Sequence, residues 1–351
     1  MGKQIDQFPQ DVPPAQLHVL EHAEDAGIQD EVGVNHQPNA VQYLIGSDTA
    51  MAQNLFNHQV QGFLYQGDCR TLLASLPAIS VQLIITSPPY NNGKEYEEQQ
   101  QTLEEYLRLQ EEVITECVRV LRPSGSICWE VGNHMVGDGE ILPLDIPLHS
   151  IFAKHRLKLR NRIVWHFEHG LHAKNRLSGR YEVLMWYTKS DDYTFNLDLV
   201  RVPQKYPGKR HFKGPHVGEL SGNPLGKNPS DVWIFPNVKS NHVEKTEHPC
   251  QFPIELVDRM LLATTNPGDV VLDPFAGTST SLVAALLRER LACGAEIMPA
   301  YVEISRRRIE QTVEGTVPFR ATGTPIYTPS NNKLAQLPAE FAAIRSQLSD
   351  K

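Results

Sequence analysis

The sequence predicts an α/β fold built on a largely parallel, wound sheet. From Phe63 onward, short apolar runs rich in β-branched residues alternate with longer segments whose apolar residues recur at helical spacing. Elements that alternate in this way form parallel sheets, because each helix crosses back over the sheet between two strands. The alternation stops between residues 198 and 247 and then resumes. We therefore expect one α/β domain in two halves, separated by an irregular insert.

The first half covers residues 61–197. Strands are predicted at Phe63–Tyr65, Val81–Ile85, Ser126–Val131, Arg162–Phe167 and Tyr181–Thr188, and helices at Arg70–Leu76, Leu103–Leu121 and Leu148–His155. The pattern is clearest in the helix at Leu103–Leu121, whose apolar residues recur every three or four positions before a Pro- and Gly-containing stop.

The second half covers residues 248–313. It is predicted to contain, in order, a helix at Pro253–Thr265, a strand at Asp269–Leu272, a helix at Leu282–Arg288, a strand at Ala292–Met298 and a helix at Tyr301–Gln311. Residues 1–60 are polar and without sustained period, so they predict a flexible N-terminal arm with one helix near Ala15–Ala26. Residues 314–351 are expected to form a surface tail.

Composition points to a cytoplasmic protein without a membrane anchor. No apolar run approaches the ~20 residues needed to cross a bilayer, and the first residues lack the basic and apolar regions of a secretory signal. The five cysteines are scattered, with no CxxC and no Cys/His pairing at zinc spacing. We therefore expect reduced thiols and no metal site.

Charge is distributed unevenly along the chain. The net charge is −15 for residues 1–150, +8 for residues 151–250 and −1 for residues 251–351. Within the basic stretch, residues 198–247 are rich in Pro, Gly, Lys and Arg, and irregular segments of this length are usually functional or disordered. A polyphosphate partner fits this stretch, and a solvated surface loop is the alternative.

A rigid polar loop follows the predicted strand at Val81–Ile85. Pro88 and Pro89 end the strand because they lack N–H donors, and they leave Ser87 and Tyr90 at its C-terminal end. In open α/β sheets ligands bind at that end. A hydroxyl, free carbonyls and an aromatic face suit a planar ring that carries an amine. A turn that merely ends the strand is the alternative.

A second loop, Asp273–Ser281, joins the predicted strand at Asp269–Leu272 to a helix. Its small residues allow a ligand to approach the backbone, and the helix N-terminus offers free N–H groups. Glu296 lies 23 residues after Asp273, at the end of the next strand, where a carboxylate can accept ribose hydroxyls. The loop has Gly277 alone and no Gly-Lys-Ser/Thr, so a nucleoside fits better than NAD or ATP.

Together these motifs resemble those of the S-adenosylmethionine-dependent DNA amino-methyltransferases, which methylate N4 of cytosine or N6 of adenine. The resemblance rests on the catalytic motif at Thr86–Tyr90, the cofactor motif at Asp273–Thr280, the acidic motif at Glu296-Ile297, the adenine-contacting motif at Gly67-Asp68 and the segment His248–Pro253. The catalytic motif comes first, which is the circularly permuted β order. The resemblance covers residues 62–312 and implies a Rossmann-like methyltransferase fold with helices on both faces of a twisted sheet.

The resemblance also implies the site. Ser87 and the Pro88 carbonyl would accept the amine hydrogens of a flipped base, beside Pro89, and Tyr90 would stack on the base. The implied residues for S-adenosylmethionine are Asp68, Thr86, Pro249, Asp273, Phe275, Ala276, Gly277, Thr278, Ser279 and Glu296. Ser279 departs from the family, which has a second glycine there. The implied DNA-binding residues are Lys174, Arg176, Arg180, Lys205, Lys209, Arg210 and Lys213, with residues 198–247 as the target-recognition region.

The implied activity is site-specific methylation of double-stranded DNA in a restriction-modification system. Ser87 favours N4 of cytosine, because family members with S-P-P-Y often modify cytosine and those with D-P-P-Y adenine. N6 of adenine is the alternative, and a non-catalytic nucleic-acid-binding module is the alternative from another class. Carbon-5 methylation is disfavoured, since the catalytic loop has no Pro-Cys. A homodimer and a cognate restriction endonuclease are further partners compatible with the resemblance.

Overall fold

The computed structural model describes residues 42–93, 101–136, 139–168, 170, 172–239 and 241–326. The predicted helix at Ala15–Ala26 and the tail beyond residue 326 lie outside these residues. Within them, no helix is long and apolar enough to cross a membrane.

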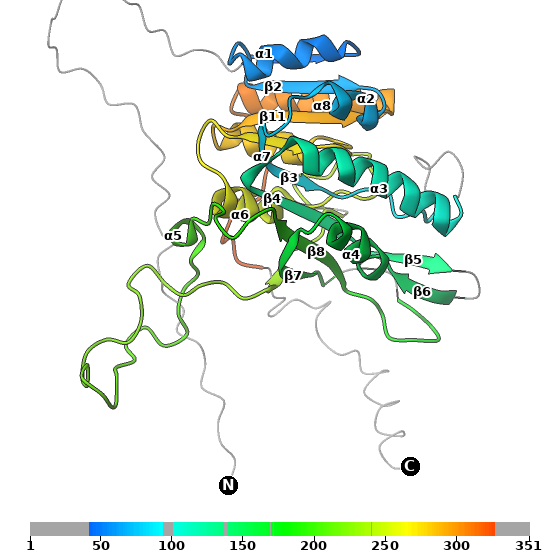
Figure 1. Cartoon of the computed structure of the whole chain (residues 1–351). Helices are drawn as coiled ribbons and strands as arrows, with labels where there is room; N and C mark the ends of the chain where they lie inside the picture. The colour runs from blue at the N-terminus through cyan, green and yellow to red at the C-terminus, as the bar shows by residue number, and fades with distance from the viewer. Residues whose placement is uncertain are drawn as a thin grey trace, which may run out of the picture. The chain divides into compact units, whose positions relative to one another are not determined.

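The described residues form a nine-stranded sheet in the order β1-β2-β11-β10-β3-β4-β8-β7-β9 (Figure 1). Its strands are β1 (Tyr43–Gly46), β2 (Gly62–Gln66), β3 (Val81–Thr86), β4 (Leu121–Val131), β7 (Lys158–His166), β8 (Tyr181–Thr188), β9 (Val232–Ile234), β10 (Val270–Asp273) and β11 (Leu291–Glu296). A separate hairpin pairs β5 (Asn133–Val136) with β6 (Glu140–Pro143).

The strands from β1 to β4 in this order are parallel, β8 is antiparallel to both β4 and β7, and β9 is parallel to β7. The parallel strands therefore share one edge at which they end, the carboxyl edge, and one at which they begin, the amino edge. β3 and β10 are neighbours although they lie far apart in the sequence, with Leu83 opposite Val271. The loops that follow these two strands consequently meet at the carboxyl edge. The predicted mostly parallel α/β fold is confirmed.

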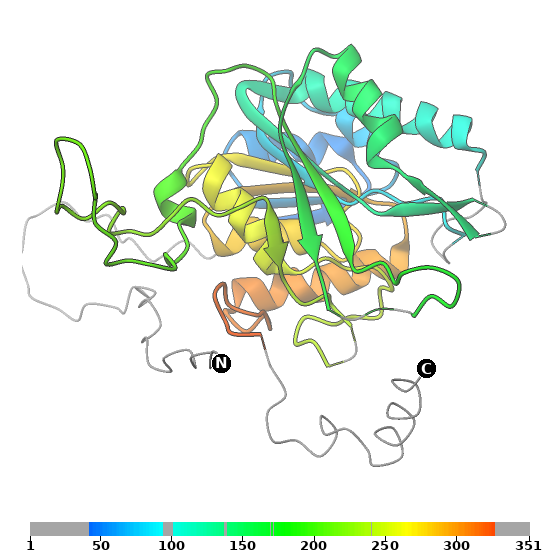
Figure 2. The same cartoon turned by 90° about the horizontal axis from the view of Figure 1, so that it is seen from below.

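Helices cover both faces of the sheet (Figure 2). On one face lie α1 (Ala52–Phe56), α2 (Cys69–Ser75), α3 (Leu103–Val120) and α4 (Asp145–Lys154), and on the other α6 (Ile254–Thr264), α7 (Thr280–Leu287) and α8 (Pro299–Val313). The alternation of β3 divides its side chains between two cores: Ile84 packs under the first set of helices, and Leu83 and Ile85 under the second. A strand that is apolar on both faces is the pattern expected of a buried parallel strand.

Residues 43–60 differ from the expectation of a flexible arm. β1 pairs in parallel with β2, and α1 buries Ala52 and Leu55 in the first core. The polar composition around them hides this short apolar run. The first part of the expected tail also packs on the fold, since Val317 is buried and the Arg320 side chain pairs with the buried Glu255.

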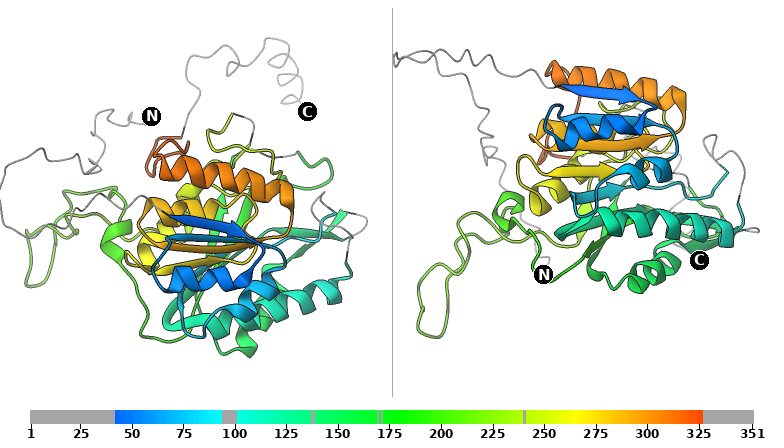
Figure 3. Two further views of the ribbon diagram at one scale, coloured as in Figure 1. Left: turned by 90° about the horizontal axis from the view of Figure 1, so that it is seen from above. Right: turned by 45° about the horizontal axis from the view of Figure 1, so that its top comes forward.

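The predicted insert, residues 198–247, is divided into two parts by a short strand of the sheet, β9. The chain passes through α5 (Leu197–Val200) beside the end of α6, where Asn196 N donates to the Ala263 carbonyl at 2.7 Å. Residues 201–229, here called the projecting loop, then extend from the amino edge, closed at their base by the bridge between Val202 and Lys227 (Figures 1 and 3). β9 runs back toward the carboxyl edge, and residues 235–250 approach the end of β10.

Candidate active site

A cavity of about 780 Å³ opens at the carboxyl edge. Its wall includes residues 87–91 after β3, here called the catalytic loop, and residues from Asp273–Ser281 after β10, here called the cofactor loop. The turn that follows β11 and the side of α3 that faces these loops also contribute. The volume of the cavity falls in the range of small-molecule and cofactor sites. All four predicted catalytic residues line it: Ser87, Pro88, Pro89 and Tyr90. The strand order thus brings together two loops that the sequence separates.

The hydroxyls of the catalytic loop have a fixed direction. Tyr90 Oη donates to Glu130 Oε2 at 2.5 Å, and Ser87 Oγ lies 3.0 Å from Tyr90 Oη. Since the phenolic proton is committed to Glu130, the serine hydroxyl donates to Tyr90 Oη. The lone pairs of Ser87 Oγ are then left to accept a hydrogen bond in the cavity.

A single carboxylate organises the cofactor loop. Asp273, buried at the end of β10, accepts from Phe275 N at 3.0 Å, Ser281 Oγ at 2.6 Å and Thr86 Oγ1 at 2.5 Å. Burial raises the pKa of Asp273 to about 6, against the opposing effect of these donors. The bond from Thr86, the last residue of β3, ties the catalytic strand directly to the cofactor loop.

The cofactor loop passes through the left-handed region twice. Gly277 has φ +54° and Ser279 has φ +60°. The conformation suits the glycine, whereas a serine there is strained, which explains why a glycine in this position is favourable. Ser279 is fully buried, its Oγ has no hydrogen-bond partner among the described residues, and it does not line the cavity. Behind the loop, the buried Arg308 donates to the Thr278 carbonyl at 2.6 Å and to Thr280 Oγ1 at 2.9 Å.

Glu296 lies at the end of β11 on the cavity wall. Its Oε2 accepts from Gly277 N at 2.9 Å and its Oε1 from Met298 N at 2.7 Å. A carboxylate has about four lone-pair sites, so each oxygen keeps a free one for a ligand hydroxyl. Burial raises the pKa of Glu296 to about 7.

The predicted cofactor residues fall into two groups. Those that line the cavity are Asp68, Phe275, Ala276, Gly277, Thr278 and Glu296, and those that do not are Thr86, Pro249, Asp273 and Ser279. Thr86 and Asp273 support the loops from behind. The Pro249 carbonyl accepts from Lys239 Nζ at 2.8 Å, while its neighbours His248 and Cys250 line the cavity. Asp68 caps α2 and pairs with Arg70 at 2.6 Å, and this pairing lowers the pKa of Asp68.

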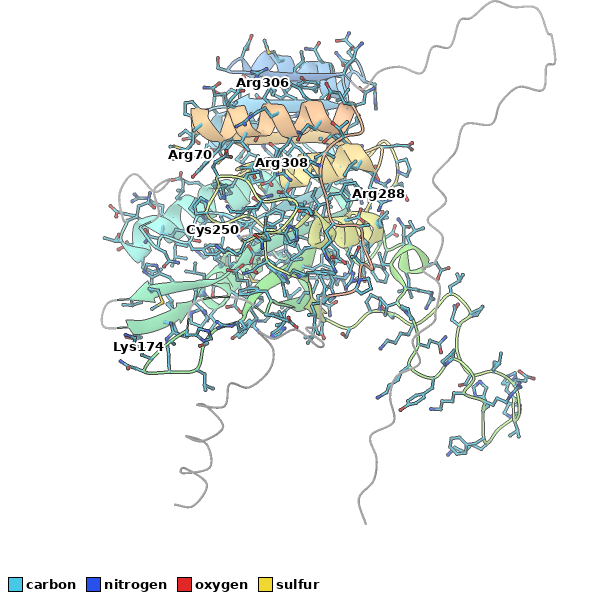
Figure 4. All side chains as sticks on the ribbon, turned by 180° about the vertical axis from the view of Figure 1, so that it is seen from behind. Arg70, Lys174, Cys250, Arg288, Arg306 and Arg308 are labelled. Carbon is cyan, nitrogen blue, oxygen red and sulfur yellow. The ribbon has the colours of Figure 1, made fainter. Side chains whose placement is uncertain are left out.

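The seven predicted DNA-binding residues are not brought together. Lys174, Arg176 and Arg180 belong to the connection between β7 and β8 at the carboxyl edge, and in Figure 4 Lys174 lies on the same side as Cys250. The other four are exposed on the projecting loop, at the amino edge: Lys205, Lys209, Arg210 and Lys213. Figure 4 shows that loop on the side of Arg288, away from Cys250. β8 runs from the carboxyl edge to the amino edge, so the three residues before it and the four residues after it lie at opposite edges of the sheet.

The sequence did not point to three charged residues behind the site: Glu130 and Arg308, which are buried, and Glu182, which is partly exposed. The sequence does indicate that Glu130 is unusual, because it is a lone carboxylate in the otherwise apolar strand Ile127–Val131. Glu182 stands second in an equally apolar strand, β8. Arg308 is one of three consecutive arginines on α8, and only its position on the buried face of that helix distinguishes it.

Comparisons with known proteins point to one family. A family model described as DNA methylase matches residues 81–307. The type II methyltransferase M.BglII of Bacillus subtilis is 50% identical over 242 residues, covering 69% of this chain and 67% of that protein. The DNA adenine methyltransferase YhdJ of Escherichia coli is 34% identical over 252 residues, covering 70% and 82%. The solved cytosine-N4-specific PvuII DNA methyltransferase superposes with a TM-score of 0.56 at 21% identity, over 72% of this chain and 92% of that one, and shares the fold.

Proposed function

The chain belongs to the DNA methylase family of S-adenosylmethionine-dependent amino-methyltransferases, and we propose that it methylates the exocyclic N4 of a cytosine flipped from duplex DNA. One observation supports this most strongly. The hydrogen bond between Thr86 and Asp273 joins the catalytic loop to the cofactor loop at a single cavity. The similarity of the chain to type II methyltransferases supports a role in a restriction-modification system.

The residues of the cavity fit S-adenosylmethionine. The free lone pairs of Glu296 suit the two ribose hydroxyls, and Asp68 stands on the wall for the adenine. The atom nearest to a Cβ on Gly277 would be in the His248 ring, at 3.6 Å, an ordinary van der Waals contact, so the loop backbone is open toward the cavity. When bound, the cofactor supplies an electrophilic methyl group on a positively charged sulfur.

The catalytic loop suits an amine that is a poor nucleophile, because its lone pair is delocalised into the base. Ser87 Oγ, whose lone pairs are free, and the Pro88 carbonyl accept the two amine hydrogens. This favours a pyramidal nitrogen and directs its lone pair toward the methyl group. Tyr90 lines the cavity and offers its ring for stacking. Alignment of the two reactants supplies much of the remaining acceleration.

Two observations bear on the target base. A serine at position 87 supports cytosine, whereas the similarity to an adenine methyltransferase supports N6 of adenine. The deciding experiment expresses the chain in a host without DNA methylation and identifies the modified nucleosides by mass spectrometry. N4-methylcytosine is the expected product. N6-methyladenine in its place would overturn the assignment to cytosine while leaving the reaction class intact.

DNA is proposed to lie along the carboxyl edge, so cations there contribute more than those on the projecting loop. Replacing Lys174 and Arg176 by alanine is expected to weaken DNA binding by about tenfold and to reduce the salt dependence by about two counterions. The matched pair Lys209 and Arg210, exposed on the projecting loop, is expected to change neither quantity by much. Titrations at several salt concentrations measure both, and equal losses in the two double variants would refute this DNA path.

Cofactor affinity is expected to depend on pH through Glu296. The ionised carboxylate accepts hydrogen bonds from the ribose hydroxyls better than the protonated form does. Burial raises the pKa of Glu296 to about 7, so this hydrogen bonding is strongest above pH 7 and weakens as the pH falls through that value. Lowering the pH from about 8 to about 6 should weaken binding by about tenfold, as the ionised fraction falls. Glu296→Gln should bind more weakly at high pH and lose this dependence. Calorimetric titration measures both, and an unchanged pH dependence in the variant would exclude Glu296 as its source.

A further inference from the structure

A chain of hydrogen bonds leads from the cavity into the protein. It passes from Ser87 Oγ to Tyr90 Oη, and from Tyr90 Oη to Glu130 Oε2. Ser87 and Tyr90 line the cavity, while Glu130, on β4, is only 2% exposed. A stacking role for Tyr90 needs the ring but not the hydroxyl, so the contact with a buried carboxylate calls for a separate explanation.

Glu130 is one of two adjoining carboxyl groups. It pairs with Leu184 across β4 and β8, and Glu182 stands two residues before Leu184, so both glutamates project from the same face of the sheet. The two carboxyl groups lie within hydrogen-bonding reach of each other. Glu130 Oε1 receives no hydrogen bond from an N–H or hydroxyl group of the described residues. A proton held by Glu182 would satisfy this oxygen.

The charge state of the pair follows from its surroundings. Burial raises the pKa of both glutamates, and the charge of Glu130 adds to the rise at Glu182. The nearby polar groups of Ser87, Tyr90 and Glu182 lower the pKa of Glu130, and Lys239, facing from the segment after β9, lowers that of Glu182. His134 on β5 contacts the Tyr90 carbonyl at 3.3 Å. The pKa of Glu182 is therefore raised further than that of Glu130, so a single proton held by the pair rests on Glu182 and leaves Glu130 as the proton acceptor.

We propose that Glu130, supported by Glu182, accepts the proton that the target amine must release, through the hydroxyls of Tyr90 and Ser87. This inference rests on the proposed function, because it needs an amine that has just received a methyl group. Such a nitrogen carries a positive charge and one surplus proton. Its N–H bond breaks as Ser87 Oγ gains the proton, the serine passes its own proton to Tyr90 Oη, and the tyrosine passes its proton to Glu130. Both hydroxyls are regenerated, and the positive charge on nitrogen and the negative charge on Glu130 cancel, leaving a neutral amine and a neutral carboxylic acid.

The direction of the resting hydrogen bonds favours this path. Each hydroxyl already donates away from the cavity, so no group has to rotate before the proton moves. The buried negative charge at Glu130 also stabilises positive charge as it develops on the amine, since charges interact more strongly in a site from which water is excluded.

Single-turnover methyl transfer measured from about pH 5.5 to about pH 9 tests the relay. The wild-type rate constant is expected to fall at low pH, where Glu130 becomes protonated. Glu130→Gln should lower it about 100-fold and abolish this pH dependence, and Tyr90→Phe should lower it about tenfold while keeping the ring. Tyr187→Phe is the matched control. It removes a hydroxyl from another buried tyrosine, bonded to His149 at 2.8 Å outside the cavity, and should leave the rate and the pH profile unchanged.

Substitutions of Glu182 test the relay through the pH profile of the rate constant, which a purely structural role of this residue would not shift. Glu182→Gln keeps a donor for Glu130 and should retain the wild-type pH profile. Glu182→Leu removes the donor, so the fall in rate should move to higher pH. A wild-type rate and profile in Glu130→Gln or in Tyr90→Phe would overturn the relay. If the wild-type enzyme itself transfers no methyl group, the proposed function fails instead, so the two failures are distinct.

Discussion

Replacing Ser87 by alanine is expected to lower the rate constant of methyl transfer by about 100- to 1,000-fold, the usual effect of removing one preorganised polar contact to a transition state. The hydrogen bond from Tyr90 to Glu130 directs the serine proton away from the cavity, and the alanine variant has no oxygen there to accept the amine hydrogen. Affinity for S-adenosylmethionine should stay within about twofold, because the Ser87 side chain takes part in none of the three hydrogen bonds by which Asp273 holds the cofactor loop.

Rapid-quench measurements with labelled cofactor separate the transfer step from binding. The control is Ser80→Ala, which removes a hydroxyl just before the opposite end of the same strand, β3, where it donates to the Pro77 carbonyl at 2.7 Å. The control should transfer methyl groups at the wild-type rate. A Ser87→Ala enzyme that is equally fast would show that the amine is held by other groups.

Asp273→Ala is expected to weaken cofactor binding by about 100-fold or more. The variant leaves three donors of the cofactor loop without their acceptor: Phe275 N, Ser281 Oγ and Thr86 Oγ1. Each unsatisfied buried donor costs about 1–3 kcal/mol, and about 3 kcal/mol is already more than 100-fold in affinity. Isothermal calorimetry measures the loss, and thermal denaturation should show lower stability as well.

Asp258→Asn separates loss of stability from loss of binding. Asp258 is a second buried aspartate, and it pairs with Arg288 at 2.7 Å at the far end of α7. Breaking this pair should lower the melting temperature without changing the dissociation constant of the cofactor. If Asp258→Asn and Asp273→Ala weaken cofactor binding equally, the effect of Asp273 is one of general stability and the proposed role of the loop is wrong.

Local patterns predicted most of the elements that build the site. The apolar run ending at Pro88 indicated β3, and the capping residues Thr102 and Glu105 stand where α3 begins, as its periodicity required. The family motifs then identified both loops, which the structure places side by side because β3 and β10 are neighbours. The predicted fold is therefore right where each element carries its own hydrophobic pattern.

What the sequence did not predict depends on contacts between distant segments. β1 has only four residues and is stabilised by pairing with β2, and β9 has three and depends on β7. The basic insert looked continuous, and only the direction of β9 reveals that the projecting loop leaves from the amino edge. Glu182 gained significance only through its strand register opposite β4, which places it beside Glu130.

In the proposed function, one cavity joins the loop that holds the amine to the loop that holds the methyl donor. The most direct measurement incubates purified protein with methyl-labelled S-adenosylmethionine and unmethylated duplex DNA, then digests the DNA and locates the label. We predict label on an exocyclic amine, that of cytosine N4, in the wild-type protein and its loss in Ser87→Ala. The absence of label from DNA of any sequence, with the protein folded and the cofactor bound, would show that this cavity does not methylate DNA.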